Sequence, residues 1–219
     1  MKLLTFLGVG KYTSVRYVWG DKEWETDLFP EALTRWLNPS QVLVLLTEEA
    51  RQHTHWANLQ ERLSSQVTLT PVDIPSGRSE TELWDIFARL TECLNEGDKV
   101  VFDVTHAFRS IPILCLLAVA YLRVAKSVNL QAILYGAYEA KDKNNRAPVF
   151  DLTPFLSLLD WVTATDKFVK TGDARELANL LKAAHSLPWK SAGAADRSDL
   201  PRQLQGLGTT LQNLSQSLL

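Results

Sequence analysis

The stretch KVVFDVTHAFRSIP, residues 99–112, contains the change of pattern that decides the fold. Its first half is a run of apolar and β-branched residues, which indicates a strand buried on both faces. Its second half is polar, and Ser110 and Pro112 are residue types that begin helices, here at the apolar segment 111–124. A buried strand followed by a helix is half of a βαβ unit. The stretch therefore predicts a parallel sheet covered by helices.

The same alternation continues on both sides of this stretch. Gly20-Asp21-Lys22 separates two β-rich segments and predicts a hairpin. The apolar run 41–46 is typical of a parallel strand covered on both faces. Strands are expected at 2–7, 13–19, 23–26, 41–46, 67–74, 99–104 and 130–135, a short edge strand at 149–151, and helices at 28–37, 47–63, 80–94 and 111–124. This order predicts an α/β fold with a Rossmann-like, mainly parallel, doubly wound sheet.

The strand pattern stops at Pro154, and the remainder predicts helices at 155–169, 173–185 and 200–219. We therefore expect two domains. Residues 1–152 form a Rossmann-like ligand-binding domain, and residues 153–219 form an all-helical extension, which is either part of a truncated effector domain or a dimerisation element.

Composition narrows the class of protein. The 219 residues are 46% hydrophobic with a net charge of −2, which excludes a disordered chain and a protein that coats duplex DNA. Cys93 and Cys115 lack a CxxC partner and are expected to be buried thiols in a reducing compartment.

The apolar run 111–124 is too short to span a membrane, so the expected location is the cytoplasm, with no membrane partner. His53 and His55 lack further ligands nearby and are expected at a solvated helix start, so no metal is predicted.

Residues suited to ligand binding follow three expected strands at their carboxyl ends, where open α/β sheets bind ligands. The first set is Gly8, Gly10 and Lys11, followed by Tyr12, Thr13 and Ser14. Two glycines allow a phosphate to approach the backbone, and Lys11 supplies positive charge. The alternative is a tight turn between two strands.

The second set spans residues 103–110 and contains Asp103, Thr105, His106, Phe108, Arg109 and Ser110. It lies between a buried strand and a helix N-terminus, where free N–H groups attract anions. Arg109 is suited to bidentate phosphate binding. The alternative is that Asp103 and Thr105 fix the turn and His106 only packs.

The third set is Gly136 and Tyr138, with a tyrosine suited to base stacking or simply to packing. Arg78, after the strand at 67–74, is a weaker phosphate candidate.

Three blocks of this sequence resemble one family. FDVTHAFRSIP at 102–112 is similar to the DVTHxFRSxP signature of a subfamily of CRISPR-associated Rossmann fold (CARF) proteins of type III CRISPR systems. FLGVGKY at 6–12 and ILYGAYEA at 133–140 resemble the other two blocks of the subfamily, in the same order. Ala107 stands where glycine is commoner.

The resemblance implies a homodimer that binds a cyclic oligoadenylate on its two-fold axis during antiviral signalling. Cyclic tetra-adenylate is favoured over cyclic hexa-adenylate as the ligand. It implies no cofactor and no DNA partner. The leading hypothesis is a metal-independent ring nuclease, in which the 2′-oxygen attacks the adjacent phosphorus and yields a 2′,3′-cyclic phosphate. Lys11 and Arg109 would stabilise charge, Ser14 and Thr105 would orient the reacting groups, and His106 is either a general acid–base or a structural anchor. The expected ligand-binding residues are Gly8, Gly10, Lys11, Tyr12, Thr13, Arg78, Asp103, Thr105, His106, Phe108, Arg109, Ser110, Gly136 and Tyr138.

The alternative is a non-catalytic sensor domain of a CARF–HEPN ribonuclease whose nuclease half is missing. Members of the family usually carry an R-x4–6-H nuclease motif, and none is found. A transcription regulator is disfavoured because residues 160–219 hold seven Lys/Arg and six Asp/Glu. A NAD-dependent oxidoreductase is disfavoured because Thr13 stands where a GxGxxG motif needs its third glycine.

Overall fold

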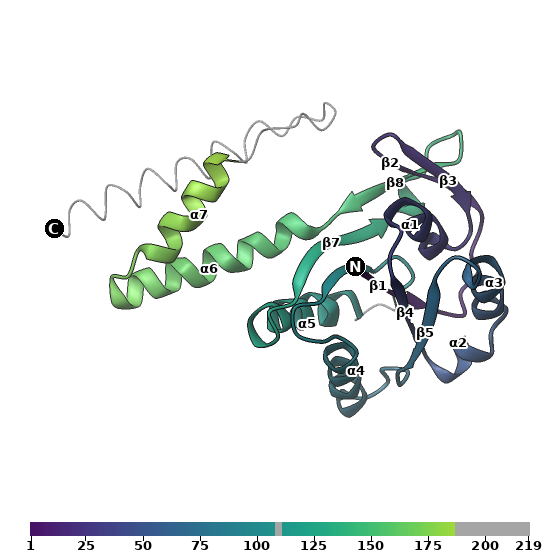
Figure 1. Ribbon diagram of the computed structural model, residues 1–219, viewed down its shortest axis with the longest axis horizontal. Coiled ribbons are helices and arrows are strands. Elements are labelled where there is room, and N and C mark those ends of the chain that lie inside the picture. Colours follow the sequence, from purple (N-terminus) through teal and green to yellow (C-terminus); the bar gives the residue numbers. More distant parts are fainter. Residues whose placement is uncertain (108–110, 187–219) are drawn as a thin grey trace. The chain divides into compact units, whose positions relative to one another are not determined.

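The structure is a computed structural model that describes residues 1–107 and 111–186 (Figure 1). The chain divides into two compact units, Met1–Leu156 and Ser157–Leu219. Phe108, Arg109, Ser110 and the expected helix at 200–219 lie outside the described residues.

The first unit is built on one sheet with the strand order β3-β2-β8-β7-β6-β1-β4-β5. The five strands β5, β4, β1, β6 and β7 run parallel to one another, and β2 is parallel to β8. The β7–β8 and β2–β3 pairs are antiparallel. The strands span β1 (Lys2–Leu7), β2 (Val15–Trp19), β3 (Lys22–Thr26), β4 (Gln41–Leu46), β5 (Thr68–Asp73), β6 (Lys99–Asp103), β7 (Asn129–Gly136) and β8 (Arg146–Asp151). The mainly parallel α/β sheet and the β2–β3 hairpin are confirmed.

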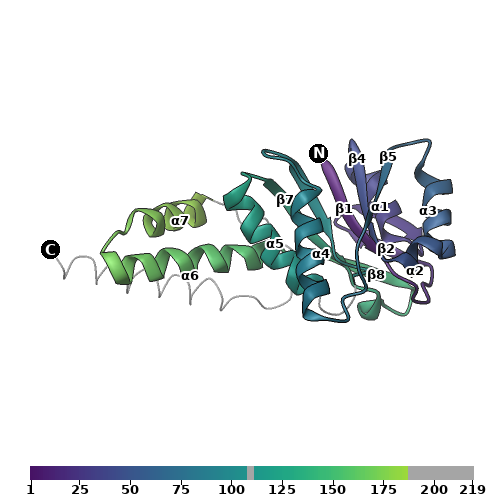
Figure 2. The same ribbon diagram turned by 90° about the horizontal axis from the view of Figure 1, so that it is seen from below.

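Helices cover both faces of this sheet (Figure 2). Helices α1 and α3 pack on one face, and α4 and α5 pack on the other. The helices of this unit are α1 (Phe29–Leu37), α2 (Glu48–Gln52), α3 (Thr54–Leu63), α4 (Glu80–Glu92) and α5 (Ile111–Ala125), with a 3-10 turn η1 at Tyr138–Ala140. The doubly wound arrangement that the sequence predicts is therefore confirmed.

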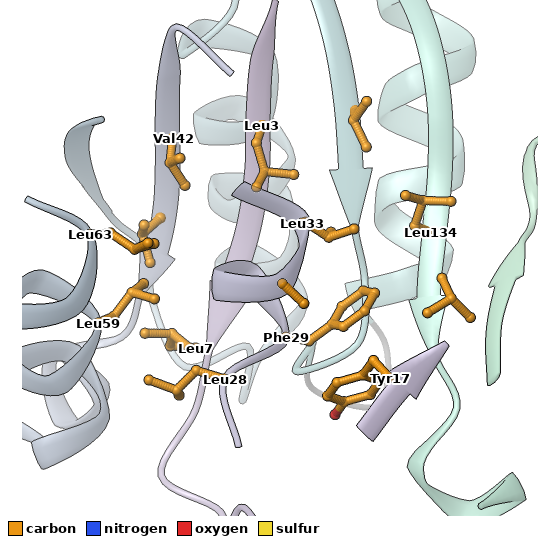
Figure 3. Packing of buried hydrophobic residues seen from close by; sticks show 14 of the residues in the cluster. Leu3, Leu7, Tyr17, Leu28, Phe29, Leu33, Val42, Leu59, Leu63 and Leu134 are labelled. Atoms are coloured by element: carbon orange, nitrogen blue, oxygen red, sulfur yellow. The ribbon is translucent and has the colours of Figure 1, made fainter. Parts of the chain in front are cut away.

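The alternation of side chains along the strands divides the core into two layers. In β1, Leu3 belongs to the layer under α1 and α3, whereas Leu4 belongs to the layer under α4 and α5. Figure 3 shows the first layer, where Phe29 of α1 lies against Tyr17 of β2. Cys115 is buried in the second layer, as expected, while Cys93 is half-buried.

Two expectations need correction. Residues 47–63 form two helices instead of one, because His53 has an extended backbone with ψ of 149° and its Nδ1 accepts a hydrogen bond from the His55 N–H. The last strand is β8, which is longer than the expected 149–151 and is not an edge strand. It lies between β2 and β7, because the hairpin occupies the edge instead.

The described part of the second unit contains two helices. Helix α6 (Thr153–Thr171) begins at the end of the first unit, and α7 (Arg175–Ser186) follows after Gly172, which has φ of +70°. Lys167 of α6 forms ion pairs with Asp173 and Glu176. In the described residues of the chain, no helix combines the length and apolar character that crossing a membrane requires.

Candidate functional site

A cavity of about 570 Å³ lies at the carboxyl ends of β1, β6 and β7. Its volume is within the range of roughly 300–1,000 Å³ that is typical of small-molecule sites. Segments that lie far apart in the sequence form its wall. The lining residues include Gly8, Gly10, Lys11, Tyr12, Thr13, Asp27, Glu49, Arg78, Thr105, His106, Gly136, Tyr138 and Glu139.

The structure brings together most of the residues that the sequence singled out. Those lining the cavity are Gly8, Gly10, Lys11, Tyr12, Thr13, Arg78, Thr105, His106, Gly136 and Tyr138. Ser14 and Asp103 are not part of the wall. Phe108, Arg109 and Ser110 fall outside the described residues, so the structure does not place them.

The segment after β1 folds back on itself around Tyr12. The Gly8 N–H donates to the Tyr12 hydroxyl at 2.8 Å, and the ring lies against the loop that carries the two glycines. Burial raises the pKa of Tyr12 to about 12, so the hydroxyl stays protonated at neutral pH. The segment from Gly8 to Tyr12 is therefore a folded loop with its own internal support.

The end of β6 is held by a buried carboxylate. Asp103 is fully buried, and its oxygens accept hydrogen bonds from the Thr5 hydroxyl at 2.7 Å and the Thr105 N–H at 2.9 Å. Burial raises its pKa to about 6 despite these hydrogen bonds. The Thr105 hydroxyl in turn accepts from the Gly136 N–H at 2.8 Å. This geometry favours the alternative in which Asp103 and Thr105 fix the turn.

His106 is engaged by a backbone donor. The Phe29 N–H, at the first turn of α1, donates to His106 Nε2 at 3.3 Å. A nitrogen that accepts this bond carries no proton, so the proton of the neutral ring is on Nδ1. Burial and the nearby His55 lower the pKa of His106 to about 3. The ring is thus neutral at physiological pH with its lone pair occupied, which favours the structural anchor over the general acid–base.

Gly136 is required by packing in the core. A Cβ atom there would lie 2.7 Å from Tyr17 Cε1 and 3.0 Å from Phe29 Cδ2. Nearby, Lys141 donates to the Tyr138 hydroxyl at 2.8 Å and lies over the Tyr138 ring. Sequence reasoning missed Lys141, although it stands only three residues from Tyr138.

Most charges on the cavity wall are paired within the protein. Arg78 pairs with Glu49, and Asp27 pairs with Arg62 of α3. Glu139 accepts a hydrogen bond from the Tyr135 hydroxyl. Among the described residues that line the cavity, Lys11 is the cation without a carboxylate partner. It is exposed and available to an anionic ligand.

The sequence also misjudged His55, which is not simply solvated. It is half-buried, its ring stacks on Tyr12 with centroids 4.1 Å apart, and its Nε2 donates to the Gly10 carbonyl at 2.8 Å. No local pattern could reveal this, because the two partners are more than 40 positions apart in sequence. In the described parts of the chain, no group of three or more metal-ligating side chains is found.

Comparisons with known proteins found similarity in sequence and in structure. CRISPR-associated protein MJ1674 of Methanocaldococcus jannaschii is 32% identical over 112 residues, which are 50% of this chain and 18% of that protein. The chain therefore spans less than a fifth of the length of this curated relative. A solved structure titled Enterococcus italicus Csm6 bound to cyclic hexa-2′-fluoro-hexa-dAMP is similar with a TM-score of 0.49 and 11% identity, over 98% of this chain and 55% of that one.

A family model described as "CRISPR system endoribonuclease Csx1, CARF domain" matches residues 2–139. The match contains all five strands of the parallel core, β1, β4, β5, β6 and β7, and the described cavity wall. It covers well over half of the chain, so the protein belongs to the family of Csx1 CARF domains.

Proposed function

We propose that this protein binds a cyclic oligoadenylate at the described cavity and acts in type III CRISPR signalling. The observation that carries the proposal is that all three sequence blocks meet at one cavity, at the carboxyl edge of the sheet. Ligands bind at this edge in open α/β sheets. Exposed Lys11 and the backbone of the Gly8–Gly10 turn suit an anionic ligand.

The proposed ligand is cyclic tetra-adenylate, with cyclic hexa-adenylate as the second choice. A homodimer would supply each wall residue twice and match the symmetry of the ring. Arg109 would add a second cation from each protomer, which allows an acidic protein to bind four phosphates.

The surface proposed for the homodimer lies on α4 and α5. Ile113, Leu117, Tyr121 and Val124 follow one another at helical spacing on α5, and each side chain is at least half exposed. Trp84 of α4 is also exposed. An apolar surface of this kind marks an interaction site, and α5 begins at Ile111, which lines the cavity. A second copy on this face would therefore lie next to the ligand.

This dimer can be tested by light scattering after size exclusion. The wild type should have twice the chain mass, and Leu117→Asp should shift it to one chain mass, because a charge in an apolar interface is costly. Glu92→Gln, an exposed change on α4, is the control. A wild type that remains monomeric at high concentration would rule out this homodimer.

We further propose that the protein cleaves its ligand without a metal. The 2′-oxygen of one ribose attacks the adjacent phosphorus, the bond from phosphorus to the 5′-oxygen breaks, and the 2′ proton is lost as the 5′-oxygen gains one. The products are linear and end in a 2′,3′-cyclic phosphate. Lys11 and Arg109 would stabilise the charge on the phosphate, while the neutral His106 would hold the loop in place. The alternative is a sensor domain that binds the ring without turnover, with its output in a nuclease half beyond this sequence.

One experiment separates these proposals. Purified protein is incubated with radiolabelled cyclic tetra-adenylate in EDTA and followed by gel shift and chromatography. A shift with conversion to linear di-adenylate supports the ring nuclease, and a shift without conversion supports the sensor. No shift with either the tetra- or the hexa-adenylate would refute the proposed ligand.

A further inference from the structure

Four aromatic rings from three parts of the chain lie in series beside the cavity, and the central three are stacked. His53 and His55 lie at the start of α3, with ring centroids 4.2 Å apart. His55 stacks on Tyr12 at 4.1 Å, with an angle of 12° between the ring planes. Tyr12 stacks on His106 at 4.0 Å and 25°. The series therefore links α3, the loop after β1 and the turn after β6.

Tyr12 is enclosed by this arrangement. One face of its ring is covered by His55 and the other by His106, and its hydroxyl accepts from the Gly8 N–H. A base cannot stack on a ring whose two faces are already occupied. Tyr12 therefore supports the wall of the cavity and does not act as a stacking platform for adenine.

His55 also contacts the same loop at a second point. Its Nε2 lies 2.8 Å from the Gly10 carbonyl oxygen, and a carbonyl only accepts, so Nε2 carries the proton. The donated bond and the stacked ring flank Lys11, because Gly10 and Tyr12 are its two neighbours in the sequence. Among the described residues, none forms a hydrogen bond or ion pair with the Lys11 side chain, so the position of Lys11 depends on Gly10 and Tyr12.

His55 is itself held firmly. The His55 N–H donates to His53 Nδ1, and the next residue, Trp56, is buried in the core layer that also contains Leu59. The imidazole thus projects from a helix that is anchored in the core. Rigid support of this kind lets a loop keep one conformation before a ligand arrives, which reduces the ordering cost of binding.

We infer that His55 is a positioning residue, which sets the conformation of the Gly8–Tyr12 loop and so directs Lys11 and the glycine backbone toward the ligand. The inference rests on the proposed function for its ligand, but the loop conformation can be measured without one. Two separate interactions carry it, and each can be removed alone. His55→Phe keeps a ring on Tyr12 and loses the donor, whereas His55→Gln keeps a donor for Gly10 and loses the ring.

The test uses the full chain with His55→Ala, His55→Phe, His55→Gln and the control Thr54→Ala, an exposed neighbour on the same helix. Amide hydrogen exchange of the peptide covering residues 8–14 is measured without ligand, and affinity is measured with cyclic tetra-adenylate. His55→Ala should accelerate exchange in this peptide and weaken binding about tenfold, in line with the loss of one hydrogen bond and one ring contact. The two single-interaction variants should each recover part of the loss, and Thr54→Ala should match the wild type.

Unchanged exchange in His55→Ala, with a melting temperature that shows a folded protein, would overturn the inference. Faster exchange with unchanged affinity would overturn it as well, because the loop conformation would then not matter to the ligand. If the wild type fails to bind cyclic tetra-adenylate, the proposed ligand is wrong, and exchange alone decides whether His55 sets the loop.

Discussion

Replacing Gly136 with alanine tests how the core fixes the site. The added Cβ would lie 2.7 Å from Tyr17 Cε1 and 3.0 Å from Phe29 Cδ2, closer than carbon atoms pack. Tyr17 and Phe29 are fully buried and contact each other, so neither ring can move without disturbing its neighbours. Overpacking of this kind costs about 1–3 kcal/mol. For a chain of this size, such a loss lowers the melting temperature by roughly 2–12 °C.

The assay is thermal unfolding of Gly136→Ala against the wild type, with Gly10→Ala as the matched control. A Cβ at Gly10 meets only Tyr12 Cε1 at 3.6 Å, which is ordinary contact, so the control should change stability by less than about 0.5 kcal/mol. Because the Gly136 N–H donates to Thr105, Gly136→Ala should also weaken ligand binding. A melting temperature within about 1 °C of the wild type would refute the packing argument.

Two further changes probe charge and protonation. Lys11→Ala should weaken binding of cyclic tetra-adenylate and make the affinity depend less on salt, because a phosphate contact is lost. The measurement is a binding titration at several salt concentrations. The control Lys99→Ala lies at the opposite end of the sheet and should change neither the affinity nor its salt dependence. The pKa of His106 is about 3 in the folded protein and ordinarily 6.5, so its contribution to stability grows as pH rises through this range. The pKa of Asp103 is about 6 in the folded protein and ordinarily 3.8, so its contribution to stability is lost as pH rises through that range. The two contributions oppose each other between pH 4 and 6. Removing the Asp103 carboxyl in Asp103→Asn should therefore make stability rise with pH by about 1.4 kcal/mol per pH unit relative to the wild type, as measured by urea unfolding. Parallel pH profiles of the two proteins would contradict the raised pKa of Asp103.

The layers of the fold could be predicted because they follow from local patterns. Runs such as 41–46 are apolar on both faces, and only a sheet covered on both sides buries such a run. The carboxyl ends of parallel strands then meet at one edge, which places Gly8, Thr105 and Gly136 together without any further information.

Features that depend on distant partners could not be predicted. The polar segment around His53 and His55 shows no sign of the loop that it contacts, since Gly10 and Tyr12 approach it only after the sheet has formed. The internal position of β8 depends on the hairpin pairing beyond it, which a short apolar run cannot reveal. The packing requirement for Gly136 could not be predicted either, because the atoms that a Cβ would approach belong to Tyr17 and Phe29, which are distant in the sequence.

The strand order also limits the length of the loop after β1. The chain leaves β1 at Leu7 and enters β2 at Val15, on the far side of β6, β7 and β8. Four strand spacings of about 4.8 Å make a distance of about 19 Å, while eight residue steps reach about 28 Å when fully extended. The excess of about 9 Å is what allows the detour around Tyr12. Deleting two residues would remove most of that excess, so related proteins with this strand order should tolerate insertions here far better than deletions.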